Sequence, residues 1–355
     1  MDESMDELIR EILGAPPPAP RATTAARNRL TSAIAAAAPA RRSRRWVLAA
    51  AGAAAAATAV ALLPTKPGTA PPAPPQPLSA RDVLLAAAHQ AATATETGRY
   101  WHVQKIGVTG PLRVGTAPDQ YDIVDRTVDE QWIARDPAEA SWAGRRELGS
   151  RPRTDADREA WRRAGSPAQW VLPGDTAAGS TRRSTTAGRA ELLPLDPSSY
   201  LLDLGGFDRA QVAALPTDPD LLRELFTRRI STSREAPGPD GLSSRLLGAM
   251  TQLLVDVPAP PAVRAAAFTV LAGIPGMRST GEVRDAEGRA GIGVELARTF
   301  SEGTETRRLV VDPATHLLLA TDYSAMSGAR SIKENHQVIL AAAWTDAKPA
   351  APTIS

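Results

Sequence analysis

The stretch "MRSTGEVRDAEGRAGIGVELARTFSEGTETRRLVVDPATHLLLATDYS", residues 277–324, predicts the sheet around which this chain folds. Segments of alternating apolar and polar residues are separated there by the turn sequences DAEGR, SEGT and DPAT. Because the connections are short, each segment is expected to pair with the next in an antiparallel meander. A further strand around 337–344 would close the sheet. The four expected strands of the meander cover residues 277–284, 290–300, 305–311 and 316–324.

Helical periodicity dominates the segment that precedes this meander. In "LPTDPDLLRELFTRRI", Asp218 is the expected N-cap and Pro219 lies in the expected first turn. The segments "GLSSRLLGAMTQLLVDV" and "PAPPAVRAAAFTVLAGIPG" carry further apolar stripes at helical spacing. We expect these three helices to pack their stripes against the sheet, as a helical insertion within it.

The first part of the folded domain predicts the remaining strands. Ser79 is the expected N-cap of a helix over 79–95, and "GRYWHVQKIGV", from Gly98, predicts a strand whose facing is ambiguous. The segment "DIVDRTVDEQWIARDPAEASWAGRREL" predicts two strands around the RDPAEA turn. Residues 150–199 predict a loop, apart from a short helix near DADREAWRRAG. The prediction is one α+β domain with an antiparallel sheet, for which the half-barrels of lipoprotein-carrier and sigma-regulator domains are an analogy.

Upstream of this domain, "RRSRRWVLAAAGAAAAATAVALL" predicts a membrane anchor. Residues 46–63 are 18 residues without a charge, and a helix of that length spans about 27 Å, close to the hydrocarbon core of a bilayer. Clustered arginines before it place the N-terminus in the cytoplasm and the C-terminal domain outside, at the cell membrane. Two alternatives are a twin-arginine export signal and a soluble alanine-rich helix. The topology residues are Arg41, Arg42, Arg44, Arg45 and Trp46.

The segments that flank the expected anchor divide the rest of the chain. Leu8, Ile9 and Ile12 belong to an apolar stripe on short amphipathic helices of the cytoplasmic tail. The stripe favours docking onto a cytoplasmic partner, a sigma factor or another regulator; the alternative is a tail that frays or lies on the membrane surface. Seven prolines among 14 residues after the anchor predict an extended stalk. The expected division is a tail over 1–45, a membrane helix over 46–63, a stalk over 64–78, an extracytoplasmic domain over 79–346 and a disordered end over 347–355.

The order of these features resembles a protein family. An acidic amphipathic N-terminus, an arginine cluster, an alanine-rich span and a proline-rich stalk are followed by "GRYWHV", "LPTDPDLLREL", "PPAVRAAAFTVLAGIPG", "DAEGRAGIGV" and "LVVDPATHLLLATDY". Over nearly the whole chain, this order resembles a family of uncharacterised actinobacterial single-pass membrane proteins designated only by a family number. Members are often encoded near extracytoplasmic-function sigma factors, which implies a link to envelope signalling. The family has no established catalytic residues, so the resemblance implies none here.

The composition excludes several kinds of chemistry. The chain has 355 residues, a net charge of +2 and no cysteine. Disulfides, thiolate metal sites and cysteine nucleophiles are therefore excluded, and the balanced charge gives no reason to expect a nucleic-acid partner. None of the four histidines stands at metal-ligand spacing from another, and no nucleophile-elbow or phosphate-loop motif occurs. We expect no catalytic residue, no metal and no cofactor, and thus no enzyme.

Tryptophan is unevenly distributed along the chain. Trp101, Trp132, Trp142, Trp161 and Trp170 fall within 70 residues, and the first three are the candidate ligand-binding residues. They could line a groove for a lipid, glycan or peptide, or they could be the large residues of the sheet's core. The sequence therefore favours a non-enzymatic sensing or binding domain outside the membrane, in envelope signalling. A carrier of lipids or other apolar ligands is the alternative, and a hydrolase is less favoured.

Overall fold

The computed structural model describes most of the chain after residue 77. The predictions made for residues 1–77 lie outside the described residues, including the topology residues 41–46 and the apolar stripe at residues 8–12. In the part of the chain that is described, no helix is both long enough and apolar enough to cross a membrane. The described residues are 78–172, 181–196, 200, 206–233, 238, 241–301 and 303–354.

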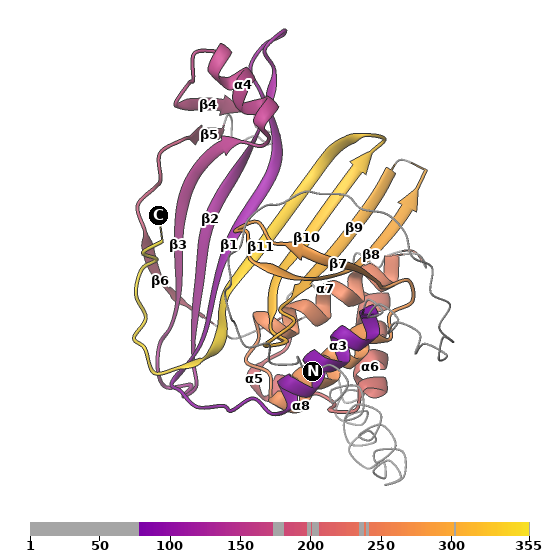
Figure 1. Ribbon diagram of the computed structural model, residues 1–355. Coiled ribbons are helices and arrows are strands. Elements are labelled where there is room, and N and C mark those ends of the chain that lie inside the picture. The colour runs from indigo at the N-terminus through magenta and orange to yellow at the C-terminus, as the bar shows by residue number, and fades with distance from the viewer. Residues whose placement is uncertain are drawn as a thin grey trace, which may run out of the picture. The chain divides into compact units, whose positions relative to one another are not determined.

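A nine-stranded antiparallel sheet carries an α+β fold, as the sequence predicts (Figure 1). Its strand order is β6-β3-β2-β1-β11-β10-β9-β8-β7. Strands β7 to β11 are neighbours both in sequence and in the sheet, while β1 pairs with β11 and joins the two halves. The strands are β1 Tyr100–Val114, β2 Tyr121–Ala134, β3 Ser141–Pro152, β4 Gln169–Leu172, β5 Thr181–Ser184, β6 Glu191–Leu195, β7 Arg278–Arg284, β8 Ala290–Phe300, β9 Gly303–Val311, β10 Leu318–Ser327 and β11 Arg330–Thr345.

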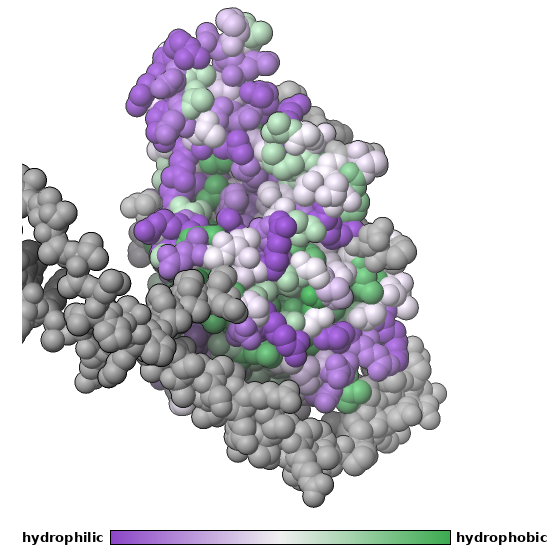
Figure 2. All heavy atoms as spheres, turned by 45° about the vertical axis from the view of Figure 1, so that its right-hand side comes forward, coloured by the Kyte–Doolittle hydropathy of each residue, from purple (hydrophilic) through white to green (hydrophobic). Residues whose placement is uncertain are grey.

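Helices α5 to α8 follow β6 and precede β7, which confirms the predicted helical insertion. Figure 1 shows α3, α6, α7 and α8 gathered together, whereas α4 and the ribbon β4-β5 lie at the far end of β1, β2 and β3. Figure 2 shows that hydrophilic residues gather over that far end. The helices are α3 Ala80–Ala92, α4 Asp155–Arg163, α5 Arg209–Ala213, α6 Pro219–Thr232, α7 Leu242–Val255 and α8 Pro261–Ala272.

Two of the predicted helix starts are confirmed by their caps. The Ser79 side chain accepts a hydrogen bond from the backbone N–H of Asp82 at the start of α3. The Asp218 carboxylate accepts from the N–H groups of Asp220 and Leu221 at the start of α6. Each bond satisfies donors that the first turn of a helix leaves without an intrahelical partner.

One face of the sheet shares the main core with the helices, and we call it the helical face. Trp101, Ile133 and Ile339 lie on it, packed in one cluster with Phe226 of α6 and Leu271 of α8. Residues paired across neighbouring antiparallel strands share a face, and successive residues alternate between faces. The alternate positions of the same strands therefore form the opposite face.

The C-terminal segment corrects one prediction, because residues 347–354 are ordered without being helix or strand. Pro352 is buried and packs over Gly144, and Ile354 packs on Ile106 and Val128 of the opposite face. The guanidinium of Arg146 also donates to the backbone carbonyl of Ile354 at 3.2 Å. The expected disorder rested on the polar, proline-rich composition. Proline and isoleucine nevertheless bury apolar surface on the sheet, which offsets the entropy of ordering the segment.

Two further segments differ from the sequence prediction. Residues 150–199 were expected to form a loop, yet they contribute the end of β3, the ribbon β4-β5 and the edge strand β6. β11 begins at Arg330, before the expected start near 337, because a tight turn at Gly328, with φ of 57°, pairs it with β10. Alternation is weak in both segments, so local patterning could not reveal strands that tertiary pairing stabilises.

Candidate functional site

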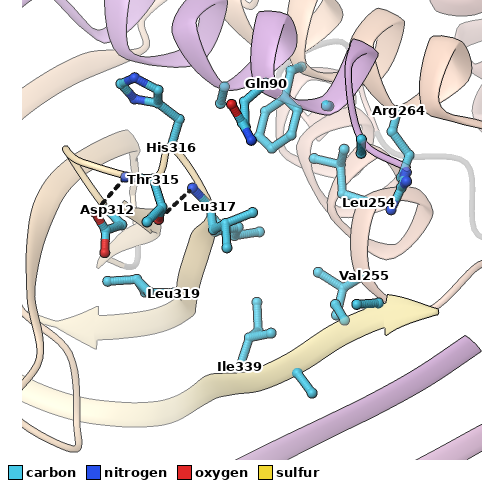
Figure 3. Close-up of a pocket in the computed structure, with 18 of the residues that line it drawn as sticks. Gln90, Leu254, Val255, Arg264, Asp312, Thr315, His316, Leu317, Leu319 and Ile339 are labelled. Carbon is cyan, nitrogen blue, oxygen red and sulfur yellow. Dashed lines mark hydrogen bonds between the residues drawn. The ribbon is translucent and has the colours of Figure 1, made fainter. Parts of the chain in front are cut away.

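A cavity of about 710 Å³ lies between α3, the end of α7, α8 and β11 (Figure 3). Its walls are mostly apolar and include Leu254 and Val255 of α7, Phe268 of α8 and Ile339 of β11. Close-packed interiors leave few voids larger than a water molecule, whereas small-molecule pockets usually measure roughly 300–1,000 Å³. The cavity thus has the size and the lining of a ligand-binding pocket.

Small side chains on facing walls explain the space. Ala87 and Ala91 line it from α3, within "VLLAAAHQAA", and Ala342, which pairs with Val103 on the helical face, lines it from β11, within "ILAAAWT". An alanine side chain ends at Cβ, so it cannot reach across a gap between two elements that larger neighbours hold apart. The alanine runs of α3 and β11 therefore encode the volume in the sequence.

Two arginines line the cavity, and their surroundings differ. Arg289, after the β7-β8 turn, donates from Nε to Asp285 Oδ2 at 2.6 Å and from Nη2 to the carbonyl of Leu319 at 2.7 Å. Arg264 of α8 makes neither a hydrogen bond nor an ion pair with any residue in the described part of the chain, and its Nε is buried without a partner. Arg289 is thus a structural pair, whereas Arg264 has unused donors.

The contact that Arg264 does make is with an aromatic ring. Its guanidinium carbon lies 4.8 Å from the centroid of Trp101, which is fully buried and donates from Nε1 to the Val255 carbonyl at 3.0 Å. Burial lowers the pKa of Arg264, and the carboxylate of Glu96 acts in the opposite direction. A guanidinium stays charged at neutral pH in any protein. The wall of the cavity therefore holds a partly desolvated cation on an aromatic face.

Trp344 of β11 adds a second donor without an acceptor. Its ring meets Trp101 edge-on at 5.7 Å and lies under the guanidinium of Arg135 at 3.9 Å. Trp344 lines the cavity, and its Nε1 is buried without a hydrogen-bond partner. A buried donor left unsatisfied costs about 1–3 kcal/mol. Arg264 and Trp344 both contact Trp101. Two donors without a partner among the described residues therefore lie in the same part of the wall.

The opposite side of the cavity is formed by the β9-β10 turn, and its polar groups are largely used within the turn (Figure 3). The Asp312 carboxylate accepts from the backbone N–H groups of Thr315 at 2.9 Å and of Ala314 at 2.7 Å. These bonds, Thr315 first, lower the pKa of Asp312 although burial opposes them. His316 takes a φ of 58°, a left-handed conformation uncommon outside glycine, and lines the cavity. This side therefore presents an ionised carboxylate, away from Arg264 in Figure 3.

The structure separates the three tryptophans proposed from the sequence. Trp101 lies on the helical face and lines the cavity. Trp132 and Trp142 pair with each other across β2 and β3 on the opposite face, where they pack with Tyr100. His102 stacks on Trp132 with ring centroids 3.8 Å apart, and the Trp132 Nε1 is buried without a partner. A single groove formed by all three tryptophans is therefore wrong, because neighbouring residues of a strand point to opposite faces.

A cluster of charged side chains also lies on the opposite face, across β9, β10 and β11. His336 Nδ1 lies 3.0 Å from Asp322 Oδ1, and Arg308 Nη2 lies 2.6 Å from Asp322 Oδ2. Glu334 bonds to Arg153 and lies 3.8 Å from His336 Nε2. The hydrogen bonds to Asp322 and then to Glu334 raise the pKa of His336 to about 9. Within the described residues, no group of three or more His, Asp or Glu side chains is placed to hold a metal ion.

Sequence reasoning missed Arg264, although a signal was present. It is the one charged residue of the apolar helix "PAVRAAAFTVLA", with no acidic residue within a helical turn. A lone charge on an apolar helix indicates either a surface position or a functional one. Only the packing of α8 against α3 and β1 distinguishes the two.

Comparisons with known proteins add no relative to these observations: no protein-family model, curated protein or solved structure matches the chain.

Proposed function

We propose that residues 78–354 form a binding domain that holds an apolar small molecule in the cavity between α3, α8 and β11. The observation that supports this proposal is the mostly apolar space of about 710 Å³ within the main core. Each Å² of apolar ligand surface transferred there from water contributes about 25 cal/mol.

The wider setting is also part of the proposal. An N-terminal anchor at residues 46–63 would place the binding domain outside the membrane, where an occupied cavity could be sensed or its content carried. The half-barrel carriers remain an analogy for such a domain, supported by helices that pack on one face of a curved sheet (Figure 1). The proposed link to a sigma factor through residues 1–45 depends on that anchor.

Binding to the full chain can be tested with dodecan-1-ol, a neutral apolar probe. Titration calorimetry should give saturable binding by the wild type, and Ala342→Phe should weaken it at least roughly tenfold, because the phenyl ring would occupy space along β11. Ala138→Phe, in the exposed β2-β3 turn, is the matched control. If the wild type binds no dodecanol, or if Ala342→Phe binds it equally well, the proposal is wrong.

The proposed location has a separate test. A reporter enzyme that is active only outside the cytoplasm is fused after Ser79, ahead of α3. The expected result is activity, which is lost when Arg41, Arg42, Arg44 and Arg45 are all replaced by glutamate. Activity of a cytoplasm-specific reporter at the same position would instead reject the extracytoplasmic location, without bearing on the cavity.

A further inference from the structure

We infer that the ligand of the cavity is an amphipathic molecule whose single anionic headgroup, a carboxylate or a phosphate, is bound by Arg264. This inference rests on the proposed binding function and adds the chemical class of the ligand. It is carried by a cation in the cavity wall that forms no ion pair or hydrogen bond with the described residues, and by the position of that cation relative to the other polar groups.

The arginines on the sheet show how this chain treats cations that serve the fold. Arg289 pairs with Asp285, Arg308 with Asp322, and Arg153 with Glu334. Asp285 lies in the same turn as its arginine, Asp322 on the neighbouring strand, and Glu334 on a more distant strand of the sheet. In each case the cation is neutralised within the protein. Arg264 departs from this pattern.

Among the described residues, Arg264 has an aromatic ring as its neighbour but no hydrogen-bond acceptor. The face of Trp101 at 4.8 Å attracts the cation, yet a ring accepts none of the five N–H groups of a guanidinium. The buried Nε has no partner among the described residues. Removing water from a cation that has no anionic partner is unfavourable. A ligand that carries an anion would therefore bind more tightly, because it supplies the ion pair and the hydrogen bonds that Arg264 does not find among the described residues.

The neighbouring groups select a ligand with both an anion and an apolar body. Trp344 Nε1 is a second buried donor without a partner among the described residues, and the Trp344 ring meets Trp101 edge-on. The planar guanidinium matches the paired oxygens of a carboxylate or a phosphate. Asp312, on the opposite side of the cavity in Figure 3, would repel an anion there. The headgroup is thus directed to Arg264, and the apolar body to the wall that Ile339 and Ala342 form on the helical face of β11.

The test compares probes with the same twelve-carbon body on the full chain: dodecanoate, dodecyl phosphate and dodecan-1-ol. The wild type should bind at least one of the two anions roughly tenfold or more tightly than the alcohol. Arg264→Gln should reduce that preference to within about twofold, measured as the ratio of the affinities of the same variant for the anion and the alcohol. Arg264→Lys should retain part of the preference, because lysine keeps the positive charge but lacks the planar pair of N–H donors that matches two oxygens of the headgroup. Arg245→Gln on α7, outside the cavity wall, is the matched control.

The outcomes separate this inference from the proposed function. If the wild type binds the alcohol and both anions equally, the cavity binds apolar molecules and the anionic headgroup is refuted. If the preference survives Arg264→Gln, another group holds the anion and the role of Arg264 is refuted. If no probe binds at all, the proposed function itself fails. Binding of the alcohol by Arg264→Gln shows that the variant is folded, and the relative affinities of dodecanoate and dodecyl phosphate distinguish the two headgroups.

Discussion

Replacing His336 with glutamine should remove a pH dependence of stability that the wild-type chain shows between pH 6.5 and about 9. His336 lies between Asp322 of β10 and Glu334 of its own strand, and the bonds to these carboxylates raise its pKa. A group that binds its proton more tightly in the folded state stabilises that state fully below its unfolded pKa. The stabilisation is then lost as the pH rises through the folded pKa.

The size of the effect follows from the difference in proton affinity. Each tenfold change is worth about 1.4 kcal/mol, so a pKa raised from 6.5 to about 9 corresponds to at most about 3 kcal/mol. The His336 side chain is 27% exposed, and solvent screening reduces this value. We expect the free energy of unfolding to fall by about 2 kcal/mol between pH 6 and pH 10 because of this residue alone.

The charged neighbours of His336 do not titrate in the same range. Burial by itself would raise the pKa of Asp322, but the hydrogen bonds from His336 and Arg308 outweigh it and lower the pKa. The hydrogen bond from His336 lowers the pKa of Glu334, and the bonds from Arg153 add to this effect against burial. Both carboxylates are therefore ionised well below pH 6. Across β1, Arg126 faces this cluster in register and is itself paired with Glu287 of the β7-β8 turn.

Urea unfolding of the full chain, followed by tryptophan fluorescence at five pH values from 6 to 10, measures this contribution. The difference in unfolding free energy between wild type and His336→Gln should shrink by about 2 kcal/mol as the pH rises. His89→Gln, which removes an exposed histidine of α3, is the matched control for the loss of an imidazole outside the cluster. Parallel curves for wild type and His336→Gln would refute the ion-pair cluster as a source of stability.

Three further substitutions test the packing of the fold. Phe226→Ala removes a fully buried ring stacked on Phe207 at 5.6 Å and should lower the unfolding free energy by about 3–5 kcal/mol, measured in urea; a loss below 1 kcal/mol would contradict the core assigned to α6. Asp218→Ala removes the cap of α6 and should cost about 1 kcal/mol in the same assay, with Asp218→Asn close to wild type. Gly144→Val places a Cβ about 2.9 Å from Pro352 and should release the C-terminal segment, seen as faster carboxypeptidase digestion; unchanged digestion would show that the segment is not held there.

Local patterning was sufficient to predict β7 to β10 and the second half of β11. β7 to β11 are joined by short turns, and each strand pairs with its sequence neighbour, so turn residues such as Gly288 mark the hairpins directly. The helix caps at Ser79 and Asp218 were predictable for the same reason, since a cap involves residues within one turn. The edge strand β6 was missed because its pairing with β3 joins segments about 50 residues apart in sequence.

The candidate site was predictable only in part. Trp101, one of the three tryptophans named from the sequence, lines the cavity, but "RYWHV" carries large side chains at successive positions, so alternation could not say which ring faced the helices. Arg264 and Trp344 lie on elements 80 residues apart in the chain and meet only through Trp101. Their lack of acceptors is a property of the packed structure, so no pattern in the sequence could show it.

The two faces of β11 connect the stability test to the binding test. His336 lies on the opposite face and Ile339, three positions later, forms part of the cavity wall. Because His336 keeps its proton up to about pH 9 and a guanidinium stays charged, the affinity for dodecanoate should stay within about twofold between pH 6.5 and 8. Above pH 9 the affinities for dodecanoate and dodecan-1-ol should fall together, since the loss of the ion pairs loosens the strand that carries the wall. A loss of affinity for dodecanoate alone between pH 6.5 and 8 would refute Arg264 as the group that holds the anion, because a guanidinium keeps its charge over that range.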